Sequence, residues 1–437
     1  MSDTAKQPVA YVRDTMLEQK PAPLSQIGAV RWIKENLFSG WFNSILTLVS
    51  IFVIYKILAG TLPWMLGGVW SAGSLSECRD ILNAKFGNTH YACWAVLTER
   101  WNQLLYGFYP STEYWRANLA FFLMLLAIAP ILFDALPRKL LWISAAFPFL
   151  MVWLVWGGTI WGPVGIAVGF VIGALAMKVL VRFGDVLALI GAVVAAIVWW
   201  MFIGPSVVDA LDASLPIGHL KEVESRELGG FMICVIIGIA GIALSLPIGV
   251  VLALGRQSDL FIVKVICVGF IEFIRGVPLI TLLFTASLIL NYFLPPNTNF
   301  DLTIRVIIMV TMFSSAYMAE VIRGGLAALP KGQYEAADAL GLDYWKAQRL
   351  IIMPQALKIS IPGIVNTFIG LFKDTTLVMF IGIFDMLGLS NAIRANSAWN
   401  GVYWELFIFI GLVFWASCFA MSQYSQWLER KLRTDHH

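Results

Sequence analysis

The sequence predicts an all-α polytopic membrane protein with about ten transmembrane helices, and three observations support this fold class. Hydrophobic residues make up 59% of the 437 residues. Charged residues make up only 13%, against about a quarter in soluble domains. Long apolar runs recur along the chain, each close to the roughly 20 residues that cross a bilayer. Lipid therefore has to cover most of the apolar surface, and a soluble globular fold is excluded.

Ten apolar runs are separated by shorter polar segments. A helix rises about 1.5 Å per residue, so a run of about 20 residues covers the hydrocarbon core, which is about 30 Å thick. The boundaries of the third to fifth runs are the least sharp, because these runs follow one another closely. The runs lie at 44–66, 117–136, 140–158, 161–179, 186–204, 229–254, 262–293, 302–322, 361–387 and 402–427.

Lysine and arginine residues gather at alternate ends of these runs, and this pattern predicts the orientation. The basic groups are Arg31 with Lys34, Arg138 with Lys139, Lys178 with Arg182, Arg256 with Lys264, the segment 323–360, and the end of the chain after residue 429. With ten spans, all of them fall on the cytoplasmic side if both termini are cytoplasmic. The stretches 67–116 and 205–228 then lie outside. No basic run suited to nucleic acid is present, so nucleic acid is not an expected partner.

The N-terminal tail, residues 1–43, starts with polar residues and shows no cleavable signal peptide. Within it, apolar residues recur at near-helical spacing in the segment LSQIGAVRWIKENLF at 24–38. This pattern is typical of a short amphipathic helix on the inner leaflet. A simple helical extension of the first span explains the pattern equally well.

The expected periplasmic loop 67–116 is long and contains Cys78 and Cys93 in a polar stretch. Outside the cytoplasm such a pair favours a disulfide, which would order the loop into a small cap. Two free thiols are the alternative. The other cysteines, Cys234, Cys267 and Cys418, lie inside apolar runs and are expected to be small core residues.

The polarity of the spans changes near residue 228. The spans of residues 44–228 carry few polar groups, whereas those of residues 229–433 carry charges. Charge inside a membrane is costly and usually marks a functional path. We therefore expect transport in 229–433 and an accessory five-span region in 44–228.

The segment 323–360, RGGLAALPKGQYEAADALGLDYWKAQRLIIMPQALKIS, predicts two short helices joined at a glycine. QYEAADAL favours a helix, Gly341 suits a left-handed helix end, and Asp343 is placed to cap a second helix. Pro354 is expected to end that second helix and turn the chain into the ninth span.

This segment resembles the ATPase-coupling loop of permease subunits of bacterial ABC importers. Six of seven positions of the loop pattern match, and Met353 replaces a leucine. The matching residues are Glu335, Ala336, Ala337, Gly341, Ile351 and Pro354. The motifs EFIRGVPLI, SSAYMAEVIRGG and FKDTTLV are similar to the polar amino-acid subfamily, and ACWAVLTERWNQLLYGFYP to its larger permeases for general L-amino acids or for glutamate, glutamine, aspartate and asparagine. The resemblance implies an importer permease core at 229–433, with its coupling loop at 323–360.

Charged residues in two spans are candidates for the substrate path, because an amino acid needs partners for an ammonium and a carboxylate. Glu272 and Arg275 lie three residues apart in the seventh span, and Lys373, Asp374 and Thr375 lie together in the ninth. The resemblance places Glu272 and Asp374 along the substrate cavity. Alternatively, Glu272 and Arg275 form a structural ion pair, and Lys373 pairs with Asp374.

The chain contains no GxxxxGK[ST] phosphate loop and no HExxH metal motif. We therefore expect no enzyme activity, no cofactor and no metal in this chain, with ATP and Mg²⁺ bound by a partner ATPase. The resemblance further implies a second permease subunit, an ATPase dimer, a periplasmic amino-acid-binding protein and a bacterial inner-membrane location. An ion-driven secondary transporter is the main alternative, although the two halves show no matching broken spans.

Overall fold

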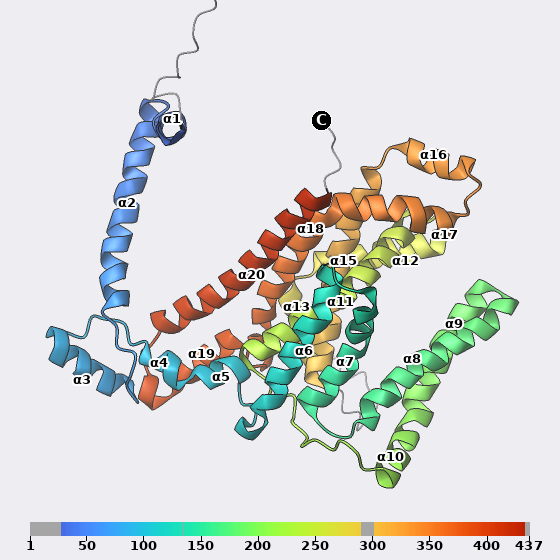
Figure 1. The fold of residues 1–437 in the computed structure, drawn as a ribbon, viewed down its shortest axis with the longest axis horizontal. Coiled ribbons are helices and arrows are strands. Elements are labelled where there is room, and N and C mark those ends of the chain that lie inside the picture. The colour runs from blue at the N-terminus through green and yellow to red at the C-terminus, as the bar shows by residue number, and fades with distance from the viewer. Residues whose placement is uncertain (1–27, 134, 290–300, 433–437) are drawn as a thin grey trace, which may run out of the picture. The chain divides into compact units, whose positions relative to one another are not determined.

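The computed structural model describes residues 28–133, 135–289 and 301–432 (Figure 1). Across these ranges the chain forms helices, with only isolated β-bridges besides them. Nine of the described helices are long and apolar enough to cross a membrane, and a bent helix pair brings the number to ten. The predicted fold class and span number are therefore confirmed.

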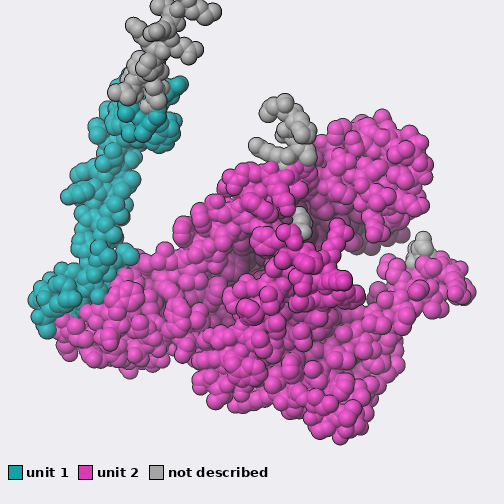
Figure 2. All heavy atoms as spheres, viewed as in Figure 1, with its two compact units in different colours: residues 1–68, 82–92 teal, residues 69–81, 93–437 magenta. Residues whose placement is uncertain are grey.

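The chain divides into two compact units, residues 1–68 with 82–92 and residues 69–81 with 93–437 (Figure 2). The first unit contains α1 (Gly28–Asn36) and α2 (Trp41–Leu66). A break at residues 37–40 separates these helices, so α1 is not a continuous extension of the first span. The expected tail residues 1–27 lie outside the described ranges. No residue of α2 is buried, as expected for a helix that relies on lipid to cover it.

The expected outer loop 67–116 is largely helical. It contains α3 (Leu75–Phe86), α4 (Ala95–Glu99) and α5 (Trp101–Tyr106). The last two pack within the second unit, where Leu104 is fully buried. A helical turn at Ser111–Glu113 already belongs to the next span, so that span begins earlier than the expected residue 117.

Five further helices belong to the accessory region, where they make up its second to fifth spans, and a buried arginine ties part of it together. They are α6 (Tyr114–Leu132), α7 (Leu141–Trp156), α8 (Trp161–Leu180), α9 (Asp185–Val198) and α10 (Gly204–Ser214). A π-helical segment, Trp199–Ile203, joins the last two, so the fifth span extends to Ser214 rather than to residue 204. Arg116 is fully buried and donates to the Leu154 carbonyl at 2.7 Å and to the Lys221 carbonyl at 2.8 Å.

The remaining helices form the larger part of the second unit. They are α11 (Gly230–Gln257), α12 (Phe261–Gly276), α13 (Leu279–Phe284), α15 (Leu302–Ala327), α16 (Lys331–Ala339), α17 (Tyr344–Ala347), α18 (Met353–Asp374), α19 (Met386–Ala395) and α20 (Trp404–Leu432). Small residues allow close packing of α11 on α15. A Cβ atom at Gly249 would lie 2.7 Å from the Met318 side chain, so a larger residue there would push the two helices apart.

The seventh span is broken within residues 262–289, which corrects the expectation of one run over 262–293; residues 290–293 lie outside the described ranges. Helices α12 and α13 meet at an angle of 103°. Pro278 lacks an amide hydrogen, and Val277 before it is extended, with φ of −111° and ψ of 132°. A residue before proline avoids helical geometry, and this explains the position of the break.

The expectation that Pro354 ends a helix is wrong. A π-helical segment, Gln348–Ile352, joins α17 to α18, and helix continues from Tyr344 to Ile381. Pro354 directly follows the π-helical segment, and such a local widening of the helix accommodates a proline inside a continuous helix. The expected span 361–387 therefore begins earlier and ends at Ile381, so that residues 382–387 lie outside it.

Candidate functional site

The segment between α15 and α18 forms two short helices joined at Gly341. This glycine has φ of +68°, in the left-handed region. Its N–H donates to the Asp338 carbonyl at 2.9 Å, and the Leu342 N–H donates to the Ala337 carbonyl at 3.2 Å. Asp343 accepts from the Lys346 N–H at 2.9 Å and so caps α17. The helix–glycine–helix shape expected from the sequence is present.

The tip of this segment exposes large apolar side chains. Leu340 is 72% exposed and Trp345 is 71% exposed, beside a half-exposed Tyr344. Glu335 and Ala336 of α16 are also exposed, whereas Ala337 is buried. Apolar side chains exposed on a polar loop usually mark a contact surface. The sequence analysis missed the three large residues, although apolar residues beside a turn were a visible signal.

The base of the segment packs into the helical core. Ile351 and Tyr334 lie against a buried cluster that includes Ile271 of α12 and Ile322 of α15. Pro354 is exposed. The base of the segment is therefore continuous with the close-packed interior formed by α12 and α15.

Five charged side chains from α11, α12 and α15 form one cluster. The Arg256 guanidinium lies 2.8 Å from Glu272 and 2.8 Å from Glu320. Arg275 lies 3.7 Å from Glu320, and Arg323 lies 3.1 Å from the same carboxylate. Three guanidinium groups therefore face two carboxylates, which leaves one positive charge in excess.

The structure corrects the expected pairing of Glu272 with Arg275. Each binds a partner on another helix instead, and the two are linked only through Arg256 and Glu320. The Arg275 guanidinium also lies over the Tyr317 ring, 5.5 Å from its centroid. Its Nε atom is buried with no acceptor among the described residues. Sequence reasoning did not assign Glu320 to the site, although the motif SSAYMAEVIRGG contains it.

The second set of predicted residues lies at the end of α18. Lys373 is exposed, Asp374 is half-buried, and no ion pair joins them in the described part of the chain. Thr375 is fully buried, and its hydroxyl donates to the Phe372 carbonyl at 2.7 Å. That hydroxyl is therefore engaged by its own helix.

The two sets lie at different depths along α11. Phe372 and Thr375 flank Gly238, whereas Met318, the neighbour of Tyr317, flanks Gly249. Eleven residues of helix separate these glycines, or about 16 Å. The structure therefore does not bring Arg275 and Asp374 together within this chain.

A buried carboxylate that the sequence analysis missed lies just beyond the ninth span. Asp385 is fully buried and caps α19 by accepting from the Gly388 N–H at 2.8 Å. Burial raises the pKa of Asp385 to about 6. The signal available in the sequence was an aspartate directly before a helix.

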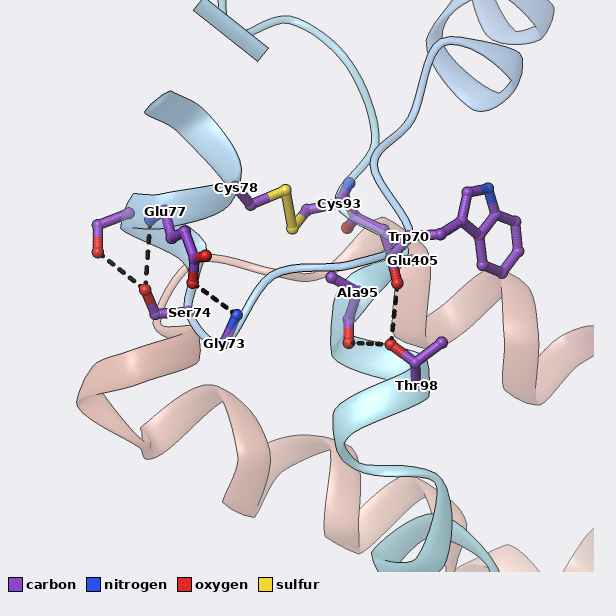
Figure 3. The surroundings of a disulfide bond; sticks show 10 residues. Trp70, Gly73, Ser74, Glu77, Cys78, Cys93, Ala95, Thr98 and Glu405 are labelled. Atoms are coloured by element: carbon purple, nitrogen blue, oxygen red, sulfur yellow. Dashed lines mark hydrogen bonds between the residues drawn. A yellow bond between two sulfur atoms is a disulfide. The ribbon is translucent and has the colours of Figure 1, made fainter. Parts of the chain in front are cut away.

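Cys78 and Cys93 form a disulfide in the structure (Figure 3). Their Cα atoms are 6.2 Å apart, and both sulfur-bearing residues are buried. The Cys93 N–H donates at 2.8 Å to the buried Glu405 carboxylate, near the start of α20. Trp70 stacks on Trp94 next to the bridge, with ring centroids 5.6 Å apart. The disulfide therefore lies in an ordered part of the second unit.

Comparisons with known proteins settle the family. The family model of the binding-protein-dependent transport system inner membrane component matches residues 245–434. The whole chain is 57% identical to the glutamate/glutamine/aspartate/asparagine transport system permease protein BztC of Rhodobacter capsulatus, and the match covers all of that protein. The chain belongs to the amino-acid ABC transporter permeases. It is thus a transport subunit that spans the membrane several times.

A second long relative among these permeases is the inner membrane amino-acid ABC transporter permease protein YhdY of Escherichia coli. It is 39% identical over 95% of this chain and 96% of its own length. A solved structure, titled as a crystal structure of an amino acid ABC transporter with histidines, shares 29% identity. It covers 46% of this chain and 91% of the solved chain, with a TM-score of 0.42.

Proposed function

We propose that this chain is the permease of an ATP-driven, binding-protein-dependent importer of polar and acidic L-amino acids. The substrates are glutamate, glutamine, aspartate and asparagine or a broader set of L-amino acids. The full-length identity of 57% to a permease named for the first four carries this proposal. The chain acts in the bacterial inner membrane with both termini in the cytoplasm.

The segment 335–354 receives a separate ATPase dimer, which binds the ATP and Mg²⁺. Its exposed surface combines Glu335 and Ala336 with the large apolar side chains of Leu340 and Trp345. Such a surface suits insertion into a groove on a partner protein. Gly341 sets its shape, and Ile351 and Pro354 lie where the segment joins α18.

The charged residues act on the substrate in sequence, because they lie at two depths. Asp374 attracts the substrate ammonium at one depth, with Lys373 near the carboxylate and Thr375 holding the local turn. Arg275 then meets a carboxylate at the other depth, where the cluster has one positive charge in excess. Glu272 balances this charge through Arg256.

A second, different permease subunit completes the path. The substrate enters from a periplasmic amino-acid-binding protein. The cap stabilised by Cys78 and Cys93 belongs to the surface that faces this protein.

Reconstitution tests this proposal against an ion-driven carrier. The full chain with its co-purifying subunits is placed in proteoliposomes, and uptake of radiolabelled glutamate is measured. We expect uptake only with ATP at the ATPase side and a cognate binding protein at the opposite side. Uptake driven by a sodium or proton gradient without ATP would overturn the proposal.

A further inference from the structure

An elongated apolar cavity lies between the accessory helices and the transport core. It has a volume of about 590 Å³ and lies wholly within the second unit. Its lining comes from α5, α6, α7 and α11 and is apolar apart from a few polar side chains such as Asn118 and Ser144. Along α6 the lining runs from Ala117 to Ile131, which corresponds to about 21 Å of helix.

The cavity exists because α6 and α7 do not pack closely on α11. Met124, Ala127 and Phe147 form a small buried cluster between α6 and α7. Only a few side chains of α11, such as Val235 and Ile239, reach that cluster. The rest of the facing surfaces stay apart, so that apolar side chains line a space where a membrane protein normally has lipid or protein.

The ends of the cavity decide between these two occupants, because a phospholipid joins an apolar chain to a charged headgroup, whereas a further membrane helix does not.

The ends of the cavity differ in polarity. At one end Tyr106 and Asn118 line it and bond to each other at 2.7 Å. At the other end the helical turn Arg138–Leu140 precedes α7, and its Arg138 and Lys139 are exposed. Over the sequence 133–140, which also contains one aspartate, the net charge is +1. Basic residues at the end of a gap between membrane helices favour an anionic headgroup.

We propose that this cavity binds one acyl chain of an anionic phospholipid, whose phosphate group is held by Arg138 and Lys139. The lipid fills the gap between the α6–α7 pair and α11. It thereby acts as a structural part of the contact between the accessory region and the transport core, distinct from the lipid that surrounds the protein.

Photo-crosslinking in nanodiscs tests the site. The full chain with its co-purifying subunits is placed in an equal mixture of phosphatidylglycerol and phosphatidylcholine, with a trace of either lipid carrying a photoreactive acyl chain. Crosslinked peptides are then identified by mass spectrometry. We expect the phosphatidylglycerol probe to label residues 117–155 and 231–244 at least threefold more than the phosphatidylcholine probe does.

Substitutions at the basic turn test the headgroup. Arg138→Gln with Lys139→Gln should lower labelling by the phosphatidylglycerol probe at least threefold. Lys178→Gln with Arg182→Gln is the matched control, because it removes the same charge near the end of α8, outside the cavity lining. This control pair should leave the labelling unchanged.

A second pair of variants tests the acyl chain. Ala243→Phe narrows the cavity from the exposed side of α11 and should lower labelling by both probes. Ala174→Phe, at an exposed alanine of α8 outside the cavity, is the matched control.

Several results would overturn the proposal. Equal labelling by the two lipids would exclude an anionic site, as would unchanged labelling in the variant of the basic turn. Labelling spread evenly over all membrane helices would show surrounding lipid only. Unchanged labelling in Ala243→Phe would show that the acyl chain lies elsewhere.

Discussion

The Glu320 carboxylate lies 2.8 Å from the Arg256 guanidinium and so joins α15 to α11. The same carboxylate also binds Arg275 of α12 and Arg323 of its own helix. Glu320 is only 17% exposed, whereas Glu272, the other acid of the cluster, is 53% exposed. Glu320 is therefore the acidic centre of the cluster, and α11, α12 and α15 depend on it for their mutual position.

Replacing Glu320 by glutamine should weaken this three-helix contact. Three guanidinium groups would lose their shared carboxylate, at a cost of roughly 2 kcal/mol for a partly buried network. We expect a lower melting temperature of the detergent-purified protein and at least a fivefold loss of uptake. Glu224→Gln, at an exposed carboxylate with no ion pair among the described residues, is the control. Wild-type uptake and stability in Glu320→Gln would contradict this role.

Gly341→Val tests the coupling segment. A β-branched residue at φ of +68° is strained by about 1–2 kcal/mol, although a Cβ there meets no atom within 4 Å. We expect normal assembly in the membrane but at least a tenfold loss of ATP-dependent uptake, because the exposed tip would change shape. Gly332→Val also has open space around it but no left-handed backbone, so it should have a much smaller effect. Equal uptake by the two variants would show that the shape at Gly341 is not needed.

Asp374→Asn tests the substrate path. The change removes a half-buried negative charge and keeps the size of the side chain. We expect the complex to assemble, as judged by co-purification of its subunits, while amino-acid uptake falls more than tenfold. Asp209→Asn, in a span of the accessory region, should leave uptake near the wild-type level. If both variants transport normally, Asp374 has no part in the path.

The raised pKa of Asp385 predicts that the stability of the folded protein depends on pH. This pKa of about 6 in the folded protein exceeds the value of about 3.9 in an unfolded chain. The folded state therefore binds more protons between about pH 4 and 6. The stabilisation by the neutral carboxyl group is complete below about pH 4 and is lost as the pH rises through 6. The upper limit of this effect is about 3 kcal/mol.

Asp385→Asn should remove that dependence, because the amide oxygen still caps α19 and carries no charge. Melting temperatures measured from pH 4 to 7 should then fall less in the variant than in the wild type. Asp343→Asn changes an exposed helix cap and should keep the wild-type fall. Parallel curves for Asp385→Asn and the wild type would rule out this titration.

The disulfide predicts a specific loss of stability on reduction. Cys78 and Cys93 are 15 residues apart, and a loop of that length contributes about 3 kcal/mol. Cys78→Ser should lower the melting temperature to the value that a reducing agent produces in the wild type. The same agent should have no further effect on the variant. If the reducing agent lowered the melting temperature of Cys78→Ser as much as that of the wild type, the effect of reduction would not come from the Cys78–Cys93 disulfide.

Much of the fold followed from the sequence, because hydropathy alone determines which segments need lipid. All ten predicted spans correspond to helices or to the bent helix pair. The helix–glycine–helix shape at 331–347 also followed, since Gly341 and Asp343 satisfy local requirements of the backbone. Such local rules do not depend on distant parts of the chain.

Features that depend on neighbouring helices were not predictable in this way. Glu272 and Arg275 have the spacing of a helical ion pair, but Arg256 and Glu320 on other helices compete for them. Pro354 was expected to end a helix, yet the π-helical segment before it lets the helix continue through the proline. Whether the chain bends at Val277 and Pro278 depends on how α13 packs against neighbouring helices, and the local sequence does not determine this packing.

The 103° bend between α12 and α13 has a consequence for hydration. The Val277 N–H at the break makes no hydrogen bond among the described residues, and hydrocarbon supplies no acceptor. Water or a neighbouring subunit has to supply one. A solute that crosses beside this bend therefore encounters a shorter dry barrier than the full thickness of the membrane would impose.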